Sequence, residues 1–175
     1  MKINHQAIKA IYFHEMDRFR RTLGQSLVSP VLSTSLYFIV FGSVIGGYVQ
    51  KIDGISYGSY IVPGLLMLTL LTQSISNTSF GIFFPKFNGT IYEILAAPIS
   101  SFEVVLAFVG AGATKTLIVG IVIFITSTFF VEVQVKYPLL MIFLMLIVAF
   151  TFALFGFLIG LLSSNFEQLS VIPTL

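Results

Sequence analysis

Cysteine is absent from the chain, and histidine occurs only at His5 and His14. Disulfide bonds, thiolate metal sites and cysteine nucleophiles are therefore excluded, and a histidine-rich metal site is disfavoured. Charged residues make up only 9% of the 175 residues, against about 25% in soluble domains, while 57% are hydrophobic. Too little polar surface remains to coat a water-soluble globule, so the composition excludes a typical soluble enzyme. The net charge of +2, without basic runs, gives no support for nucleic acid as a partner.

Long stretches of the chain carry no Asp, Glu, Lys or Arg. Three of them cover residues 22–50, 54–85 and 137–166, and a fourth, 104–131, is interrupted only by Lys115. Because about 20 apolar residues in a helix cross the hydrocarbon core of a bilayer, the chain is predicted to be an all-α integral membrane protein. The predicted transmembrane helices cover residues 27–49, 59–81, 104–130 and 139–162.

Basic residues gather before the first predicted span, at Lys2, Lys9, Arg18, Arg20 and Arg21. Since cationic residues are retained in the cytoplasm, the N-terminus and the connection 82–103 are predicted to be cytoplasmic. The two shorter connections, near 50–57 and 132–138, are then hairpins on the outer side. A rival interpretation takes residues 1–45 as a cleaved signal peptide, but its apolar run exceeds the usual length of about 7–15 residues.

An amphipathic helix is predicted within residues 1–25. One apolar stripe at helical spacing contains Ile8, Tyr12, Met16, Phe19 and Leu23, with Glu15 intruding on it. With basic residues opposite this stripe, the helix is predicted to lie in the headgroup plane, in contact with membrane lipid. The alternative is a helix packed against a partner or against the membrane domain.

The connection between the second and third spans contains its own helical signals. Asn88-Gly89 favours a turn, and Thr90 with Glu93 fits a capping box at the start of a short helix. Pro98 ends this helix, because proline lacks an N–H and restricts the residue before it. Ser100 or Ser101 can then cap the next helix. A short helix within residues 88–98 is therefore predicted, either as an ordinary ordered loop or as a docking element for a cytoplasmic partner.

Several polar or small residues lie within the predicted spans. Lys115 could line a polar path or contact an anionic headgroup. The alternative, which the length of its span favours, is that Lys115 snorkels towards the cytoplasm. Gln73 and Asn77 belong to a polar run that either bonds across helices or faces an aqueous path. Gly156 and Gly160 are four residues apart, a spacing that allows helices to approach closely.

Two stretches carry a resemblance to a known family. Residues 59–67 read Ser-Tyr-Ile-Val-Pro-Gly-Leu-Leu-Met, and residues 88–100 read Asn-Gly-Thr-Ile-Tyr-Glu-Ile-Leu-Ala-Ala-Pro-Ile-Ser. With the order of the predicted helices, they resemble the permease subunits of ABC-2 type transporters, the inner-membrane halves of bacterial ABC exporters. The resemblance implies that the short helix is a coupling helix docked in a groove of a separate ATPase subunit. Its residues would be Gly89, Thr90, Glu93, Ile94, Leu95 and Pro98, with Ala96-Ala97 in place of bulkier residues.

The resemblance also implies what the whole protein does. It implies a permease subunit, not itself an enzyme, that exports a drug, a lipid-linked compound or a polysaccharide across the inner membrane as a homodimer. ATP and Mg would be bound by a cytoplasmic ABC ATPase subunit, and this chain would bind no cofactor. The family unit has six spans, so the chain is expected to be incomplete at Leu175. A passive channel or a membrane assembly scaffold is the alternative.

The residues themselves add no catalytic set. Both histidines precede the first span, so no Ser-His-Asp arrangement is expected. Residues 110–116 superficially resemble a phosphate-binding loop, but Thr114 stands where that motif needs a glycine before Lys115. The sequence thus gives no support for an enzyme in this chain.

Overall fold

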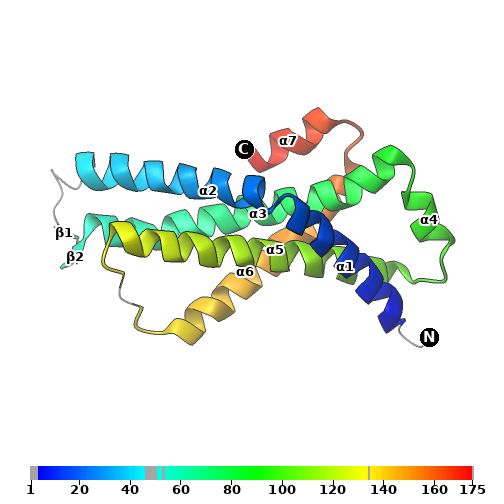
Figure 1. The fold of residues 1–175 in the computed structure, drawn as a ribbon, viewed down its shortest axis with the longest axis horizontal. Coiled ribbons are helices and arrows are strands. Elements are labelled where there is room, and N and C mark those ends of the chain that lie inside the picture. The colour runs from blue at the N-terminus through cyan, green and yellow to red at the C-terminus, as the bar shows by residue number, and fades with distance from the viewer. Residues whose placement is uncertain (1–3, 46–50, 53, 134, 175) are drawn as a thin grey trace.

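The computed structural model describes residues 4–174 except 46–50, 53 and 134. The described chain is an elongated helical bundle with one small strand pair (Figure 1). In chain order its elements are α1 (His5–Arg21), α2 (Leu23–Tyr37), the π-helix η1 (Phe38–Ile45), β1 (Lys51–Ile52), β2 (Ile55–Ser56), α3 (Tyr57–Asn88), α4 (Ile91–Ala96), α5 (Ser101–Phe130), α6 (Pro138–Leu162) and α7 (Phe166–Thr174).

Four of the described helices are long and apolar enough to cross a membrane. They are Leu23–Phe41, which joins α2 to the start of η1, and the whole of α3, α5 and α6. The prediction of an all-α membrane protein with four spans is therefore confirmed. The third and fourth spans begin within three residues of their predicted starts and end where they were expected, at 130 and 162.

The second span differs from its prediction. It was expected to end at residue 81, but α3 runs on to Asn88 with Pro63 and Pro85 inside it. Gly89 ends it in the left-handed conformation, with φ 80° and ψ −6°, which a glycine adopts without a steric penalty. Residues 82–88 are thus the last turns of a transmembrane-length helix, and only a short linker separates this helix from α4.

The helices α3, α5 and α6 form the core of the bundle, and α2 packs on its side (Figure 1). Gly156 and Gly160 of α6 lie directly against the backbone of α3. A Cβ atom on Gly156 would stand 2.5 Å from the Ile75 carbonyl oxygen, and one on Gly160 would stand 2.5 Å from that of Ser79. The predicted close approach at this pair is confirmed, because no larger residue fits between the two backbones.

The N-terminal helix α1 packs along the first half of α5. Its Tyr12 hydroxyl donates to Thr114 Oγ1 at 3.0 Å, and Phe19 is buried in a cluster with Leu66 and Val119. This is packing against the membrane domain, which was the alternative to a helix held by the headgroups. Contact between the exposed side of α1 and lipid stays a prediction.

The two short connections meet at the end of the bundle away from α4 (Figure 1). In the first connection, β1 and β2 pair antiparallel, with Lys51 opposite Ser56 and Ile52 opposite Ile55. Gly54 turns this hairpin with φ 82°, a conformation that favours glycine. The second connection links α5 to α6. We call this the hairpin end and the opposite end the α4 end.

Candidate functional site

The helix α4 presents an apolar face without a partner in the described chain. Ile91 and Ile94 pack against the core cluster around Ile82 and Phe108, whereas Tyr92 and Leu95 are 73% and 69% exposed. Residues 92, 93, 95 and 96 are all exposed and form what we call the α4 face. Two isoleucines anchor the helix while a tyrosine and a leucine point outward, which is unfavourable in water unless something covers them.

The predicted capping box of Thr90 and Glu93 is wrong. Thr90 has helical dihedral angles, φ −68° and ψ −11°, and its side chain makes no capping hydrogen bond. Its hydroxyl donates instead to the Pro85 carbonyl at 3.4 Å. An N-cap needs an extended backbone, but the left-handed turn at Gly89 leads directly into the helical region. All six expected coupling residues thus lie in or beside α4, and of these six only Ile94 packs against the core.

A capping box occurs instead at the start of α5. Ser100 Oγ accepts from the Glu103 N–H at 3.3 Å, and Glu103 Oε2 accepts from the Ser100 N–H at 2.8 Å. Ser100 was one of the two predicted caps, and its extended backbone, φ −79° and ψ 152°, suits that position. The capping box therefore stabilises the start of α5, directly after the linker that contains Pro98.

Glu103 also holds the start of α1. Its second oxygen, Oε1, accepts from the backbone N–H of Asn4 at 2.6 Å, and Asn4 itself caps α1 by accepting from Ala7 N–H at 3.3 Å. One carboxylate, only 5% exposed, thus joins α1, α5 and the linker that follows α4. Sequence reasoning missed this contact, because nothing in the sequence pairs residues that are 99 positions apart.

A buried ionic cluster lies further along α1 and α5. Lys115 Nζ and Arg18 Nη2 each lie 2.7 Å from Glu15 Oε2. The Lys115 and Glu15 side chains are 3% exposed, and the Arg18 side chain is 34% exposed. The interpretation of Lys115 as a snorkelling residue is therefore wrong, because its ammonium turns inward to a carboxylate. A signal for the pair was present, since Glu15 intruded on an apolar stripe and a buried charge needs a partner.

The helix α3 passes beside the cluster at Gly81. A Cβ atom at Gly81 would lie 3.4 Å from Glu15 Oε2 and 3.7 Å from Arg18 Nη2. Three helices thus converge on this point: α1 provides the carboxylate and one cation, α5 provides the other cation, and α3 packs beside them. In this conformation Lys115 fastens α1 to α5.

Gln73 and Asn77 lie elsewhere, on α3. Asn77 Nδ2 donates to Gln73 Oε1 at 3.4 Å, one helical turn away. Gln73 also lines a cavity of about 180 Å³ between α2 and α3, together with hydroxyl side chains such as Ser33 and Thr72. The three residues expected on a path or at headgroups are not brought together, because Lys115 bonds to α1 while Gln73 and Asn77 bond to each other.

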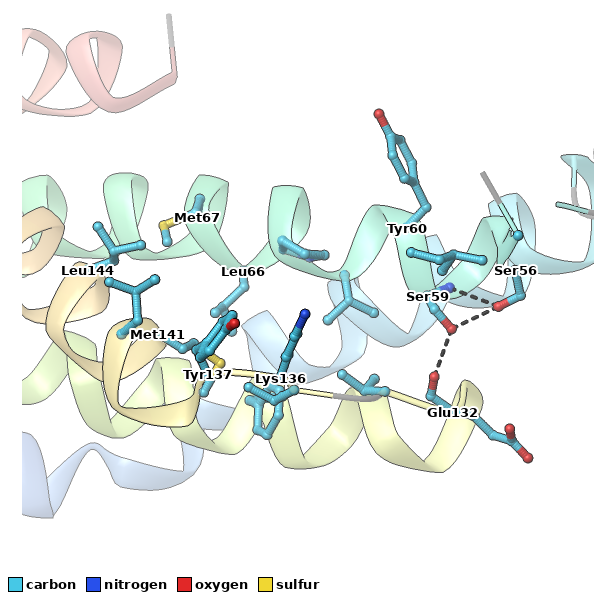
Figure 2. Close-up of a pocket in the computed structure, with 18 residues that line it drawn as sticks. Ser56, Ser59, Tyr60, Leu66, Met67, Glu132, Lys136, Tyr137, Met141 and Leu144 are labelled. Carbon is cyan, nitrogen blue, oxygen red and sulfur yellow. Dashed lines mark hydrogen bonds between the residues drawn. The ribbon is translucent and has the colours of Figure 1, made fainter. Parts of the chain in front are cut away.

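A larger cavity of about 1150 Å³ opens at the hairpin end, and we call it the hairpin-end cavity (Figure 2). Its lining comes from β2 and the first turns of α3, from the connection after α5, and from the start of α6. Ser59 Oγ donates to the Glu132 carbonyl at 2.9 Å and so fastens α3 to that connection. Sequence reasoning gave no indication of this cavity.

Comparison with known proteins gives one family. The model of the ABC-2 type transporter family matches residues 6–175. The chain is 37% identical over 168 residues to "Inner membrane transport permease YadH" of Escherichia coli strain K12, a match that covers 96% of this chain and 66% of the relative. The protein of the same name from Shigella flexneri matches with the same identity and coverage. The chain thus spans 66% of the length of these curated relatives. No solved structure matches.

Proposed function

The chain belongs to the ABC-2 type transporter family, and from this premise we propose that it is the transmembrane permease subunit of an ATP-driven exporter. It works in the bacterial inner membrane as a homodimer, with its N-terminus in the cytoplasm. The name of the E. coli and Shigella relatives, an inner membrane transport permease, supports that location. A separate cytoplasmic ABC ATPase subunit binds ATP and Mg, and the cargo is a drug, a lipid-linked compound or a polysaccharide.

The α4 face is the observation that carries this proposal. An anchored helix with Tyr92 and Leu95 turned outward suits a groove on another protein, since apolar anchors on one helical face provide the affinity of helix-in-groove contacts. We assign Tyr92, Glu93 and Leu95 to the contact with the ATPase. The same face would be hard to explain in a passive channel, which needs no cytoplasmic partner.

Both connections of α4 are suited to transmit its movement. Gly89 joins it to α3 by a single turn, and the capping box at Ser100 holds the start of α5. Because Glu103 also binds Asn4, displacement of α4 would carry α1 along with α5. The ATPase would thus move the bundle at its α4 end as one block, and a bistable packing of the spans would convert that movement into alternating access.

The test is whether the α4 face binds the ATPase. The full protein would be co-expressed with a candidate cytoplasmic ABC ATPase subunit and purified through a tag on the permease. Leu95→Asp and Glu93→Lys are expected to lose the ATPase from the purified complex. The first places a charge in an apolar contact, and the second reverses the sign of a charge in the contact. Both variants should still insert into the membrane, since neither side chain is part of the core.

A matched control is available at the same end of the bundle. Leu162 ends α6 and is 81% exposed, so Leu162→Asp adds the same charge to a similarly open position. This control should retain the ATPase. Retention of the ATPase by both α4 variants would contradict the proposal, and so would equal loss in the Leu162 control.

A further inference from the structure

The hairpin-end cavity has a lining that suits one class of ligand. We propose that it binds an anionic phospholipid of the surrounding bilayer, with an acyl chain along its apolar wall and the phosphate beside Lys136. Because the cavity lies at the end of the bundle away from α4, we assign this lipid to the outer leaflet, and that assignment rests on the proposed function, which places α4 in the cytoplasm. The binding itself does not depend on that orientation.

The wall of the cavity is largely hydrocarbon. Leu66 and Met67 of α3 face Met141 and Leu144 of α6, and Phe124 of α5 contributes an aromatic side chain (Figure 2). At about 1150 Å³ the space is slightly larger than the range of about 300–1000 Å³ that is usual for ligand pockets. Methionine side chains adapt to irregular shapes, which suits a flexible acyl chain better than a rigid solute.

A single cationic side chain lies at the mouth of the described cavity. Figure 2 shows the Lys136 ammonium directed towards α3, whereas the Glu132 carboxylate points away. In the part of the chain that the structure describes, no hydrogen bond or ion pair engages this ammonium, which lies 5.5 Å from the centroid of the Tyr137 ring. Its three N–H donors are available to a phosphate. Charge complementarity therefore selects an anionic headgroup over a zwitterionic one.

The rim of the cavity is open to an apolar surrounding. Tyr60 is 56% exposed, Leu140 is 54% exposed and Leu144 is 43% exposed. These side chains lie on α3 and α6, two helices of membrane-spanning length. An acyl chain can thus enter from the bilayer without crossing water, whereas a water-soluble anion would meet an apolar rim. This favours a membrane lipid as the occupant.

Photolabelling tests the proposal directly. The full protein would be placed in phosphatidylcholine nanodiscs with a trace of phosphatidylglycerol or phosphatidylcholine that carries a photoreactive group in one acyl chain. Labelled peptides from residues 59–67 and 140–144 would be quantified. Phosphatidylglycerol is expected to label these peptides about fivefold more than phosphatidylcholine, the ratio that about 1 kcal/mol from one exposed ion pair produces.

Two pairs of variants test separately what the Lys136 charge and the apolar wall contribute to lipid binding. Lys136→Glu should reduce phosphatidylglycerol labelling to the phosphatidylcholine level, whereas the same reversal at the exposed Lys9, at the other end of the bundle, should leave it unchanged. Leu144→Trp fills the cavity and should reduce labelling by both lipids. Leu154→Trp is its control, because Leu154 lies on the same helix, is 47% exposed and does not line the cavity.

The outcomes distinguish this proposal from that of the ATPase contact. Equal labelling by the two lipids, or full labelling of Lys136→Glu, would overturn it. Protein–protein cross-links at these peptides in place of lipid adducts would assign the cavity to a second copy of the chain and would overturn it too. Leu95→Asp, which tests the ATPase contact, should not change the labelling, so either proposal can fail while the other stands.

Discussion

Glu15 binds two cations through one carboxylate oxygen, with Lys115 Nζ and Arg18 Nη2 both at 2.7 Å. The two cations are not equivalent, because Arg18 is partly open to solvent and Lys115 is buried. Taking a charge out of water is unfavourable by several kcal/mol unless a partner compensates for it. Without Glu15, the Lys115 ammonium would be left buried beside a second positive charge. The carboxylate is therefore the residue on which the attachment of α1 depends most.

Glu15→Gln is predicted to destabilise the protein by about 3–5 kcal/mol, the usual range when one partner of a buried ion pair is removed. Exposed Asp17, on the opposite side of α1, provides the control, and Asp17→Asn should change stability little. The measurement is the midpoint of unfolding in detergent, together with the rate of proteolytic cleavage within α1. The double variant Glu15→Lys/Lys115→Glu should recover part of the loss. Identical midpoints for Glu15→Gln and Asp17→Asn would contradict the ion pair.

At the scale of the elements, the packing of α6 on α3 depends on positions without side chains. Gly156→Ala is predicted to destabilise the protein by about 1–3 kcal/mol, as other overpacked cores are. Its new methyl group would lie 2.5 Å from the Ile75 carbonyl oxygen and 2.8 Å from the Ile75 Cα, both backbone atoms that cannot rotate away.

Gly64→Ala on α3 is the matched control, because a Cβ there meets nothing within 4 Å. Alanine is the better helix former by up to about 1 kcal/mol, so this variant should be neutral or stabilised. Both variants would be compared by titration with a denaturing detergent. If Gly156→Ala unfolds no earlier than Gly64→Ala, α3 and α6 do not pack as closely as described.

The elements that the sequence located along the chain are the long apolar helices, because a long uncharged stretch by itself predicts a transmembrane helix. Lipid disfavours charge along a spanning helix, so the long stretches with little or no charge locate α3, α5 and α6 without knowledge of their neighbours. Ends are set by single dihedral angles instead. Gly89 turns left-handed after Asn88, and this places Thr90 in the helical region, where it cannot cap. A capping pattern read from residue types alone could not reveal that.

Contacts between distant residues were beyond prediction for a different reason. Glu103 and Asn4 are 99 positions apart, and Lys115 and Glu15 are 100 positions apart. Each pair meets only because α1 lies along α5, and the sequence does not specify that packing. Lys115 and Glu15 were each recognised as unusual, since one is a charge inside a span and the other a charge on an apolar stripe. What could not be read was that each is the partner of the other.

At the scale of the whole molecule, the α4 end and the hairpin end are chemically different. The α4 end carries the α4 face and the start of α1, and the basic last turn of α1, with Arg18, Arg20 and Arg21, lies part-way along the bundle beside the start of α2 (Figure 1). The hairpin end has only Lys51 and Lys136 as basic residues in its two connections. Basic residues are retained in the cytoplasm when a chain inserts. This distribution of basic residues favours an orientation with the α4 face in the cytoplasm and the hairpin-end cavity facing outward.

The absence of cysteine allows that orientation to be measured on a nearly unaltered chain. Tyr92 on α4 and Tyr137 before α6 are 73% and 61% exposed, so Tyr92→Cys and Tyr137→Cys place one thiol at each end. A membrane-impermeant maleimide is predicted to label Tyr137→Cys in intact spheroplasts and Tyr92→Cys only in inverted vesicles. Leu154→Cys, on a span that faces lipid, should be protected in both. Labelling of Tyr92→Cys from outside would show that the topology is the reverse of the proposed one. The α4 face could then not contact a cytoplasmic ATPase. Lipid binding in the hairpin-end cavity would still be decided by the photolabelling experiment.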